Sequence, residues 1–565
     1  MKSAPEFSDP PTPSRRLAIC LINPRSKPSY WTFDFAMPFF NLGRKPQYSM
    51  ANGSVVAVAA LVPAQHEVVI IDENVEPLDF ESLRRFDVIG VTGMIVQSDR
   101  MQEILLKLRS LPAMIVAGGP FVTVSEAIFE TLCDVRFIGE AEDTWPAFLN
   151  DLASGTPIKT RYEQTEKTDM TTVPVPRFDL LRRHRYATAP VQFSRGCPFL
   201  CEFCDIITIF GRRPRVKRAA QVLAELDALT AQGFKDCFLV DDNFIGNKLE
   251  AKRLLRCIIE WQEARGYPLT FTTEASINLA NDAELIDLMV KSNFRSVFIG
   301  IETPRTDSLI ETRKLQNVHG DSLLAKIARI REGGLGVVAG FIVGFDNDDE
   351  SIFDEQFEFI QASGISNLCI SLLTPVPTTP LYDRLRKEGR LDYGDPEIIY
   401  IPKKMSREQL KTGYRQLLRR VFDPGAYFDR AFDGFSGSTG VCRVGAKTAA
   451  RPVQKRPGSN LRSSVGAAVR AVRLVGVIAR KGQLRRHLRV SSRVIRRNAA
   501  LGPNAFGFEA LVNLWVMYWH FASITRHLSG TDFGTVPQPL TRPLIEPELP
   551  FAIPTSESMG ARQTH

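Results

Sequence analysis

The sequence predicts an α/β protein in which two parallel-sheet units are followed by a helical region. Short apolar runs alternate with amphipathic helical patterns twice along the chain, on either side of a polar linker that contains several prolines. After the second stretch the pattern becomes helical throughout. Such alternation is typical of parallel sheets covered by helices. The expected segments are a disordered lead at 1–16, a first sheet domain at 17–150, the linker at 151–185, a second sheet domain at 186–391, a helical extension at 392–435 and a basic and aromatic helical region at 436–565.

Five apolar runs in the first unit predict the strands of a doubly wound parallel sheet. Helical patterns such as Arg100–Ser110 and Ser125–Leu132 lie between them. Sheets of this kind bind ligands at the carboxyl ends of their strands. The five runs are Leu17–Ile22, Glu67–Ile71, Asp87–Val91, Met114–Ala117 and Val135–Ile138.

Small and polar residues follow the last three of these runs, at the edge where a ligand would bind. A glycine pair there lets a ligand lie directly against the backbone. The pattern by itself is also compatible with a nucleotide-type domain that holds no ligand. The residues expected to contact a ligand are Thr92, Gly93, Met94, Gly118, Gly119, Gly139 and Glu140.

Six further runs in the second unit predict another parallel sheet with helices between its strands. In barrels built this way, reactive residues gather on the loops at the carboxyl face. The runs are Val191–Phe193, Cys237–Val240, Leu269–Thr272, Ser296–Ile299, Val337–Val343 and Cys369–Leu373. Polar or flexible residues at the ends of these runs are Asp241, Asp242, Asn243, Glu274, Ser276, Glu302 and Gly344.

Three cysteines within eight residues, Cys197, Cys201 and Cys204, follow the first run of the second unit. A C-x3-C-x2-C loop can turn three thiolates toward one point, and iron–sulfur clusters usually have four protein ligands, so a cluster held here keeps one iron open. A structural zinc site would need a fourth ligand, and His184 and Cys237 are poorly placed to supply it. Nine cysteines in a chain without a secretory signal argue against a disulfide framework and indicate a cytoplasmic protein.

The cysteine loop, with Phe203 before its last cysteine, resembles the signature of the radical SAM superfamily. The resemblance implies a partial (β/α)6 barrel and a [4Fe–4S] cluster whose open iron binds S-adenosylmethionine (SAM). It also implies SAM contacts from Phe203 and from the polar residues that end the barrel strands, with Asp241, Asp242 and Asn243 near the methionine amino group. Glu302 would contact ribose or carboxylate, and the glycine motif that includes Gly344 would pack against adenine.

The three ligand-facing ends of the first unit resemble a cobalamin-binding domain, with Thr92 and Met94 as mild departures from the usual serine and leucine. The D-x-H-x-x-G loop of many cobalamin proteins is absent, and no histidine occurs before His66. We therefore expect no protein histidine on the lower face of the cobalt. Over residues 17 to about 435, and most specifically at Phe238–Lys248, the chain resembles the subgroup of cobalamin-binding radical SAM enzymes that contains the hopanoid C-2 methylases.

The C-terminal region separates into basic and aromatic parts. Residues 443–497 contain sixteen Lys and Arg and no Asp or Glu, whereas the whole chain has a net charge of only +8. The stretch Phe506–His527 is rich in aromatic residues, and Leu511–Ile524 is too short an apolar run to span a membrane. These features suit peripheral contact with an anionic membrane at its inner face. A helical appendage docked on the barrel is the alternative, and nucleic-acid binding is disfavoured because no recognition motif accompanies the charge.

The resemblance implies a methyltransferase that acts on an unactivated carbon of a hydrophobic small molecule, with a terpenoid lipid as one candidate. A substrate hydrogen would be abstracted by a deoxyadenosyl radical, and methylcobalamin would supply the methyl group. The implied partner is an electron donor such as a flavodoxin or ferredoxin. Radical cyclisation or rearrangement with the same cofactors is one alternative, and a non-catalytic cobalamin-linked sensor is another.

Overall fold

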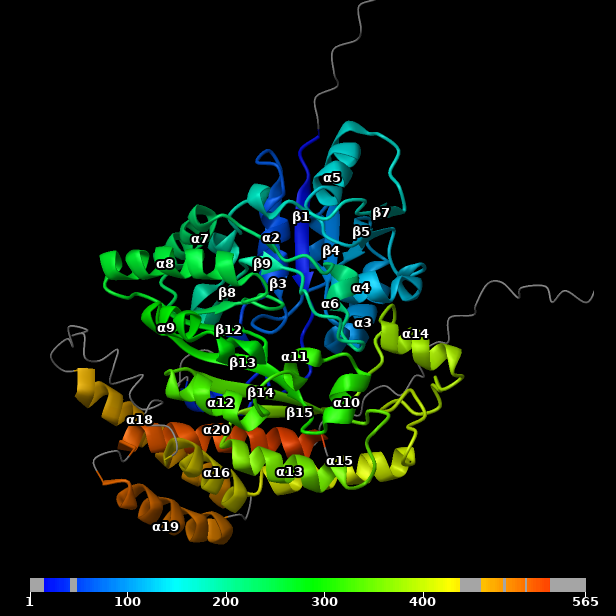
Figure 1. The fold of residues 1–565 in the computed structure, drawn as a ribbon. Coiled ribbons are helices and arrows are strands. Elements are labelled where there is room, and N and C mark those ends of the chain that lie inside the picture. The colour runs from blue at the N-terminus through cyan, green and yellow to red at the C-terminus, as the bar shows by residue number, and fades with distance from the viewer. Residues whose placement is uncertain (1–14, 41–47, 437–458, 481–483, 503–505, 529–565) are drawn as a thin grey trace, which may run out of the picture.

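The computed structural model describes residues 15–40, 48–436, 459–480, 484–502 and 506–528. Within them the predicted fold class is confirmed: one parallel-sheet domain, a second curled parallel sheet and a set of C-terminal helices (Figure 1). Most of the lead expected at 1–16, and large parts of the region expected at 436–565, lie outside these residues.

The first domain contains a six-stranded parallel sheet with the order β3-β1-β4-β5-β6-β7 (Figure 1). Successive side chains of a strand point to opposite faces. Cys20 and Ile22 therefore pack with helix α3, whereas Ile19 and Leu21 pack with α2 and α5. The strands are β1 (Ala18–Asn23), β3 (Glu67–Asp72), β4 (Val88–Thr92), β5 (Met114–Gly118), β6 (Val135–Ile138) and β7 (Arg161–Glu163), and the helices are α2 (Gly53–Ala60), α3 (Ser98–Leu108), α4 (Pro120–Val124) and α5 (Thr144–Ser154). The short helix α1 (Met37–Phe40) lies on the connection that follows β1 and packs away from this domain.

Two local expectations for this domain were wrong. The predicted helix Ser125–Leu132 is a short 3-10 helix, Glu126–Phe129, because α4 begins earlier, where Pro120 fixes a helical φ at its first turn. Strand β7, three residues within the expected linker, pairs with β6. Such a short edge strand has no apolar run by which the sequence could reveal it.

The second sheet has seven parallel strands in the order β15-β14-β13-β12-β11-β8-β2. All six predicted runs overlap a strand, but the first strand lies earlier than predicted, at β8, because its polar start concealed it. The strands are β2 (Tyr48–Met50), β8 (Tyr186–Val191), β11 (Asp236–Leu239), β12 (Thr270–Glu274), β13 (Phe294–Glu302), β14 (Gly336–Val343) and β15 (Leu368–Leu372). Their helices are α7 (Ala219–Ala231), α8 (Lys248–Arg265), α9 (Ala283–Lys291), α10 (Thr306–Glu311), α11 (Leu315–Val318), α12 (Leu323–Glu332), α13 (Ile352–Ser363) and α14 (Pro380–Lys387).

Strand β2 comes from the N-terminal part of the chain, yet it pairs with β8 at the edge of the second sheet. The chain therefore leaves the first sheet after Asn23 and crosses to the second one before returning at α2. We call residues 24–40 the crossing segment. The sequence did not predict that β2 joins the second sheet, because this pairing depends on tertiary contacts and not on a local apolar run.

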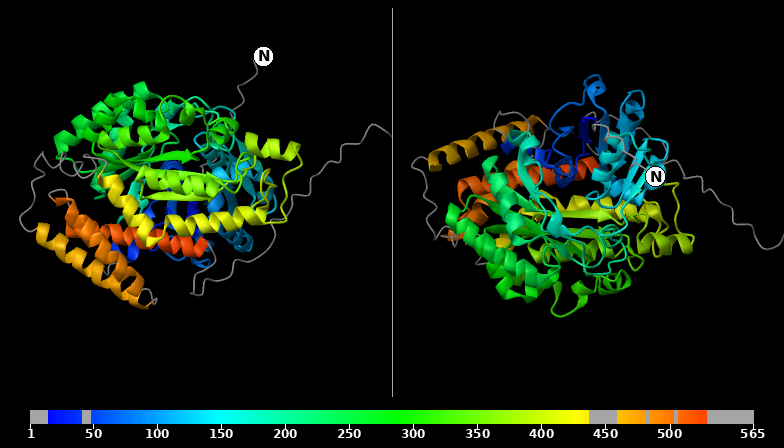
Figure 2. Two further views of the ribbon diagram at one scale, coloured as in Figure 1. Left: turned by 60° about the horizontal axis from the view of Figure 1, so that its bottom comes forward. Right: turned by 90° about the horizontal axis from the view of Figure 1, so that it is seen from above.

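The C-terminal helices are α15 (Arg407–Val421), α16 (Pro424–Ser436), α18 (Ser459–Arg480), α19 (Leu484–Ala500) and α20 (Phe508–Leu528). Figure 2 shows α20, in red, alongside α15 beneath the second sheet. Tyr518, Trp519 and Phe521 of α20 are buried. Of the two predictions for this aromatic helix, this burial favours an appendage docked on the barrel over a helix that faces a membrane, because its rings pack against Tyr30, Phe422 and Phe428.

Candidate functional site

The cysteine loop begins directly after β9 (Ser194–Arg195), which pairs with β10 (Arg215–Val216). At Gly196 the backbone turns with φ +95°, and a β-carbon there would lie 2.8 Å from the carbonyl oxygen of Gly211. Only glycine fits this turn without strain. Cys197 follows and donates its amide to the same carbonyl at 3.2 Å.

Asp241 and Asp242, two of the predicted SAM contacts, accept hydrogen bonds from the backbone at the start of this loop. The Oδ1 atom of Asp241 accepts the amides of Phe193 and Ser194 at 2.7 and 2.8 Å, and Oδ2 of Asp242 accepts that of Gly196 at 2.7 Å. Burial raises the pKa of Asp241 to about 7 and that of Asp242 to about 6, against the amide hydrogen bonds that lower both. Oδ2 of Asp241 has no hydrogen-bond partner among the described residues. It therefore retains an accepting site, and a SAM contact there stays a prediction.

Two amides approach the cysteine sulfurs. Asn243 Nδ2 lies 3.8 Å from Sγ of Cys197, and Gln316 Nε2 lies 3.5 Å from Sγ of Cys201. The Asn243 amide also donates to Ser276 Oγ at 3.1 Å, so these two predicted residues meet. Donors beside thiolates stabilise their negative charge.

A buried cation, Lys314, completes the surroundings of the thiols. Its Nζ lies 2.5 Å from Oε1 of Glu302, the residue predicted to contact SAM, and 5.8 Å from the ring centre of Phe203. Burial alone would lower the pKa of Lys314, but Glu302 and the cysteine thiols raise it above its ordinary value. Glu302 itself has φ +66°, a strained conformation for a residue with a side chain. Burial also raises the pKa of Glu274, the predicted contact on the next strand, to about 7.

These surroundings fit an iron–sulfur cluster. Three thiols share one loop, two amides donate toward their sulfurs, and a buried ammonium offsets their charge. In the described part of the chain, no three His, Cys, Asp or Glu side chains converge closely enough to hold a single metal ion. A four-iron cluster is larger than one ion, so its ligands need wider spacing.

Gly344, the last predicted SAM contact, follows β14 with φ +107°. A β-carbon there would lie 2.3 Å from the hydroxyl oxygen of Tyr400, which donates to the Gly344 carbonyl at 2.7 Å. Packing against Tyr400 therefore requires glycine at position 344. The contact of Gly344 with adenine remains a prediction.

The predicted cobalamin residues gather at the carboxyl ends of the adjacent strands β4, β5 and β6. Thr92 stands opposite Gly118 in the sheet register. At Gly119, φ is +100° and a β-carbon would lie 2.3 Å from Oγ1 of Thr92, so any side chain would fill this edge. Gly139 has φ +87°, and a β-carbon there would lie 2.8 Å from Oε1 of Gln164, so a side chain is excluded at this position too.

This cradle of small residues fits the tail of a large cofactor. Gly93 packs near Met101 and Gln97, and Met94 is more than half exposed beside it. His66 lies at the amino end of β3, where its Nδ1 accepts the amide of Leu17. It is therefore remote from the carboxyl edge, and the expectation of a cobalt without a lower histidine stays a prediction.

Glu140, predicted as a cobalamin contact, has a different set of partners. Arg195 Nη1 lies 2.7 Å from its Oε1, and Arg215 Nη2 lies 3.0 Å from its Oε2. Burial would raise the pKa of Glu140, but the two arginines hold it below its ordinary value. Because Arg195 directly precedes Gly196, this ion pair joins the edge of the first sheet to the cysteine loop.

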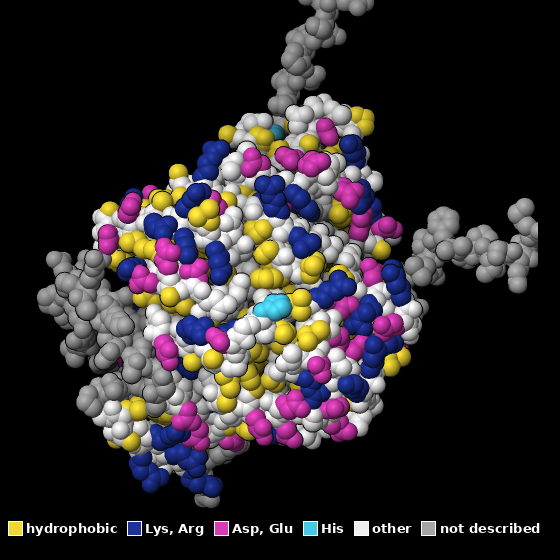
Figure 3. Space-filling view, in the orientation of Figure 1, with side chains coloured by type: hydrophobic (Ala, Val, Ile, Leu, Met, Phe, Trp, Pro, Cys, Tyr) yellow, Lys and Arg dark blue, Asp and Glu magenta, His cyan; other side chains and the backbone are white. Residues whose placement is uncertain are grey.

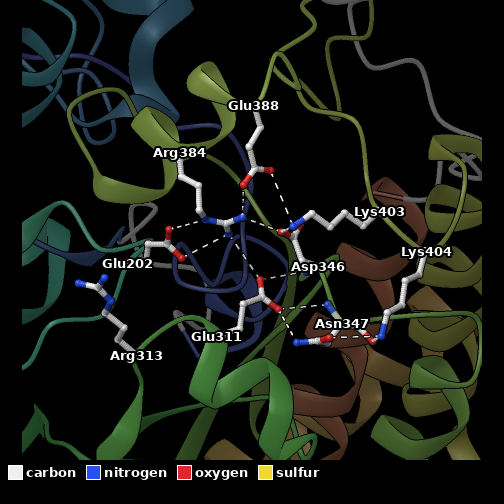
Figure 4. A pocket seen from close by; sticks show the side chains of 9 residues that line it. All are labelled: Glu202, Glu311, Arg313, Asp346, Asn347, Arg384, Glu388, Lys403 and Lys404. Carbon is white, nitrogen blue, oxygen red and sulfur yellow. Dashed lines mark hydrogen bonds and ion pairs between the residues drawn. The ribbon is translucent and has the colours of Figure 1, made fainter.

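A charged pocket of about 370 Å³ lies on the other side of the loop (Figure 4). Its centre is Arg384 of α14, which bonds Glu202 at 2.6 Å and Asp346 at 2.6 Å. Because Glu202 lies between Cys201 and Phe203, these bonds fix the loop to the last part of the barrel.

Sequence reasoning did not assign roles to Arg195, Arg215, Lys314, Gln316 or Arg384. Arg195 had a local signal, because it adjoins the cysteine motif. Lys314, Gln316 and Arg384 come from distant positions, and no spacing in the sequence marks them or Arg215. The described residues include no helix with the length and apolar character needed to cross a membrane.

Three sequence families match the chain. Residues 42–149 match the B12 binding domain, residues 191–360 the radical SAM superfamily, and residues 379–531 a domain of unknown function (DUF4070). An uncharacterized methyltransferase of Synechocystis sp. is 38% identical over 74% of this chain and 78% of its own length. The hopanoid C-2 methylase of Rhodopseudomonas palustris is 31% identical over 74% of this chain and 79% of its own.

Two solved structures share the fold. The radical SAM methyltransferase TsrM of Kitasatospora setae, with cobalamin and a [4Fe–4S] cluster bound, gives a TM-score of 0.57 at 18% identity, over 72% of this chain and 82% of that one. The cobalamin-dependent radical SAM enzyme OxsB, with aqua-cobalamin and SAM bound, gives 0.57 at 15% identity, over 91% and 80%.

Proposed function

This chain belongs to the cobalamin-binding radical SAM methyltransferases, and we propose that its substrate is a hydrophobic, lipid-like molecule methylated at an unactivated carbon. Its cofactors are a [4Fe–4S] cluster, SAM and cobalamin. When bound, they supply radical chemistry and a transferable methyl group. The chain's own part is to hold and orient them.

The proposed ligands of the cluster are Cys197, Cys201 and Cys204. Asn243, Gln316 and Lys314 would offset the thiolate charge through the contacts described above. The cradle around Gly118 and Gly119 would receive the cobalamin tail. The remaining predicted contacts are proposed for SAM, at Phe203, Asp241, Asp242, Asn243, Glu274, Ser276, Glu302 and Gly344, and for cobalamin, at Thr92, Gly93, Met94, Gly139 and Glu140.

The observation that carries the lipid-like substrate is the outer face of α18. Leu474 and Ile478 on its inner face pack with Trp519 of α20. The outer face is also apolar, because Val465, Val469, Val472 and Val475 are all exposed. Exposed arginines flank them, among them Arg473 and Arg480 on α18 and Arg489 and Arg496 on α19. An exposed apolar stripe between cations suits an anionic lipid surface.

The hopanoid C-2 methylase likeness supports a terpenoid lipid within this class. A lipid-like substrate would then be taken up where the protein touches the membrane. An electron donor such as a flavodoxin or ferredoxin is the proposed second partner.

The reaction can be tested with anaerobically reconstituted protein, hopanoid lipid and SAM that carries a deuterated methyl group. Methylation transfers the label to the lipid. A lipid product that contains no label would instead indicate cyclisation or rearrangement. Consumption of SAM with no change in any lipid offered would contradict the proposed substrate class.

Membrane contact can be tested by flotation with phosphatidylglycerol vesicles. Replacing Val469 and Val472 by serine should reduce flotation, and salt should weaken it, because the Debye length falls from about 10 Å at 0.1 M to about 3 Å at 1 M. Leu249→Ser is the matched control, since Leu249 is 59% exposed on α8, on the outside of the barrel. Equal flotation of the variant and the control would leave α18 as a docked helical appendage.

A further inference from the structure

The crossing segment carries one tryptophan with unusual surroundings. Trp31 is 46% exposed, although its neighbours Tyr30 and Thr32 are buried. Its carbonyl oxygen accepts a hydrogen bond from Oγ of Ser49 in β2 at 2.9 Å. Phe33, two residues on, has φ +51°, a strained conformation for an aromatic residue. The backbone on both sides of Trp31 is thus fixed while its ring stays open to solvent.

The Trp31 ring lies against the inner face of the barrel sheet. Its centre is 5.0 Å from that of Phe298, edge to face at 84°. In β13, Val297, Ile299 and Ile301 are fully buried on the helix side. Side chains alternate along a strand, so Phe298 shares its face with Gly300. A β-carbon on Gly300 would lie 2.2 Å from Oε1 of Glu302 and 2.8 Å from Nζ of Lys314, so this face leads to the Lys314 ammonium beside the cysteines. Trp31 therefore lies over the same face of the sheet as the proposed SAM site.

Phe298 is itself placed by a glycine in the neighbouring strand. A β-carbon on Gly340 of β14 would lie 2.7 Å from Cζ of Phe298. The tip of the Phe298 ring therefore extends over Gly340, where a larger residue would displace it. Trp31 and Phe298 together present two aromatic rings, set edge to face, on this side of the barrel sheet.

The C-terminal helix α20 holds Trp31 in this position. His520 Nε2 lies 3.1 Å from the carbonyl oxygen of Tyr30, and the His520 ring stacks on Phe33 at 5.1 Å. Tyr30 also packs against Phe521 at 6.1 Å between ring centres. Leaving a tryptophan ring exposed forgoes stability, because burying an aromatic side chain removes about 150–250 Å² from water and each Å² contributes roughly 25 cal/mol. The fold instead anchors the residues around Trp31 and leaves its ring uncovered.

We propose that Trp31 contacts the substrate and selects molecules with a broad, rigid apolar face, and that α20 positions it for this. The inference rests on the proposed lipid-like substrate and deepens it. An indole and a phenyl ring set edge to face form a flat-sided corner, which contacts a fused-ring skeleton over a larger area than a flexible chain. A flexible chain also loses more conformational freedom on binding.

The test uses doxyl-cholestane, a nitroxide-labelled steroid, with the full-length protein in detergent. Immobilisation of the nitroxide, measured by paramagnetic resonance, reports binding. Quenching of tryptophan emission that is present in the native protein and absent in Trp31→Phe reports contact with this one of the five tryptophans. We expect binding to weaken at least ~10-fold in Trp31→Ala, which is about 1.4 kcal/mol, and to be largely retained in Trp31→Phe. Leu249→Ala, a change at a somewhat more exposed apolar residue outside the barrel, should bind as the native protein does.

The outcomes separate this inference from the proposed function. If the steroid binds the native protein and Trp31→Ala equally, or if Trp31 emission is unquenched while it binds, the role of Trp31 is refuted and the substrate class stands. If doxyl-stearic acid binds as tightly as the steroid, the selection for rigid molecules is refuted. If the native protein binds neither probe, the lipid-like substrate is refuted, and the inference with it. Should Trp31→Ala fail to fold, the comparison of Trp31→Phe quenching with the native protein decides the matter.

Discussion

Glu140 and Arg195 form a buried ion pair at 2.7 Å that connects two domains. Glu140 follows β6 in the first sheet, and Arg195 ends β9, two residues before Cys197. The pair therefore joins the strand edge proposed to hold cobalamin to the loop proposed to hold the cluster.

Removing this ion pair should lower the free energy of unfolding. Breaking a buried pair costs about 3–5 kcal/mol when it leaves a charge uncompensated. In Glu140→Gln the Arg195 charge keeps Glu142 as a partner, so the loss should lie at or below the lower end of that range. Urea unfolding at neutral pH measures the loss. The control is Asp179→Asn, which breaks the exposed pair with Arg177 and should cost less than about 1 kcal/mol.

The pH dependence of the same pair follows from its charge. The pKa of Glu140 is lower in the folded protein than in the unfolded chain, so its stabilising effect is complete above the unfolded value. It is lost as the pH falls through the folded value. The stability difference between the native protein and Glu140→Gln should shrink in acid, and a constant difference from pH 7 to pH 3 would contradict the assignment.

Cys201→Ala should abolish both cluster assembly and SAM cleavage, because two thiolates do not suffice to hold the cluster. Iron content and visible absorption after anaerobic reconstitution measure the first, and release of deoxyadenosine measures the second. Cys257→Ala is the matched control, since Cys257 lies on α8 outside the loop. Near-full iron content in Cys201→Ala would refute the proposed ligand set.

Gly119→Leu should prevent cobalamin binding, because the side chain would collide with Thr92 and fill the cradle. We expect binding at least ~10-fold weaker than in the native protein, measured by cobalamin absorption after gel filtration. Gly155→Leu shares the positive φ, at +72° against +100°, but has open space around its β-carbon. Loss of cobalamin from both variants would indicate backbone strain as the cause.

Acid should loosen α20 from the crossing segment. Burial lowers the pKa of His520 to about 4 from 6.5, and its bond to the Tyr30 carbonyl only partly opposes this. A group with a depressed pKa stabilises the fold above its unfolded pKa and ceases to do so as the pH falls to the folded value. Between pH 6.5 and 4 the loss should approach about 3 kcal/mol. The protection factors of the α20 amides, which correct for the slower intrinsic exchange in acid, should fall over this range in the native protein and not in His520→Phe.

The sequence by itself determined the alternating elements and the cysteine loop. Apolar periodicity depends only on neighbouring residues, and it located each of the six strands expected in the second sheet and the five expected in the first. The C-x3-C-x2-C spacing is equally local. The short strands β2 and β7 were not predicted, because three residues carry too little apolar pattern to be distinguished from a loop.

Only the tertiary structure decided what surrounds the site. Lys314, Gln316 and Arg384 reach the cysteine loop from positions more than a hundred residues away, and Glu140, expected as a cofactor contact, also pairs with Arg195. The aromatic C-terminal helix, expected at a membrane, is buried against the crossing segment. Side chains far apart in sequence meet only when the sheets pack, because burial and charge pairing depend on the whole fold and not on local spacing.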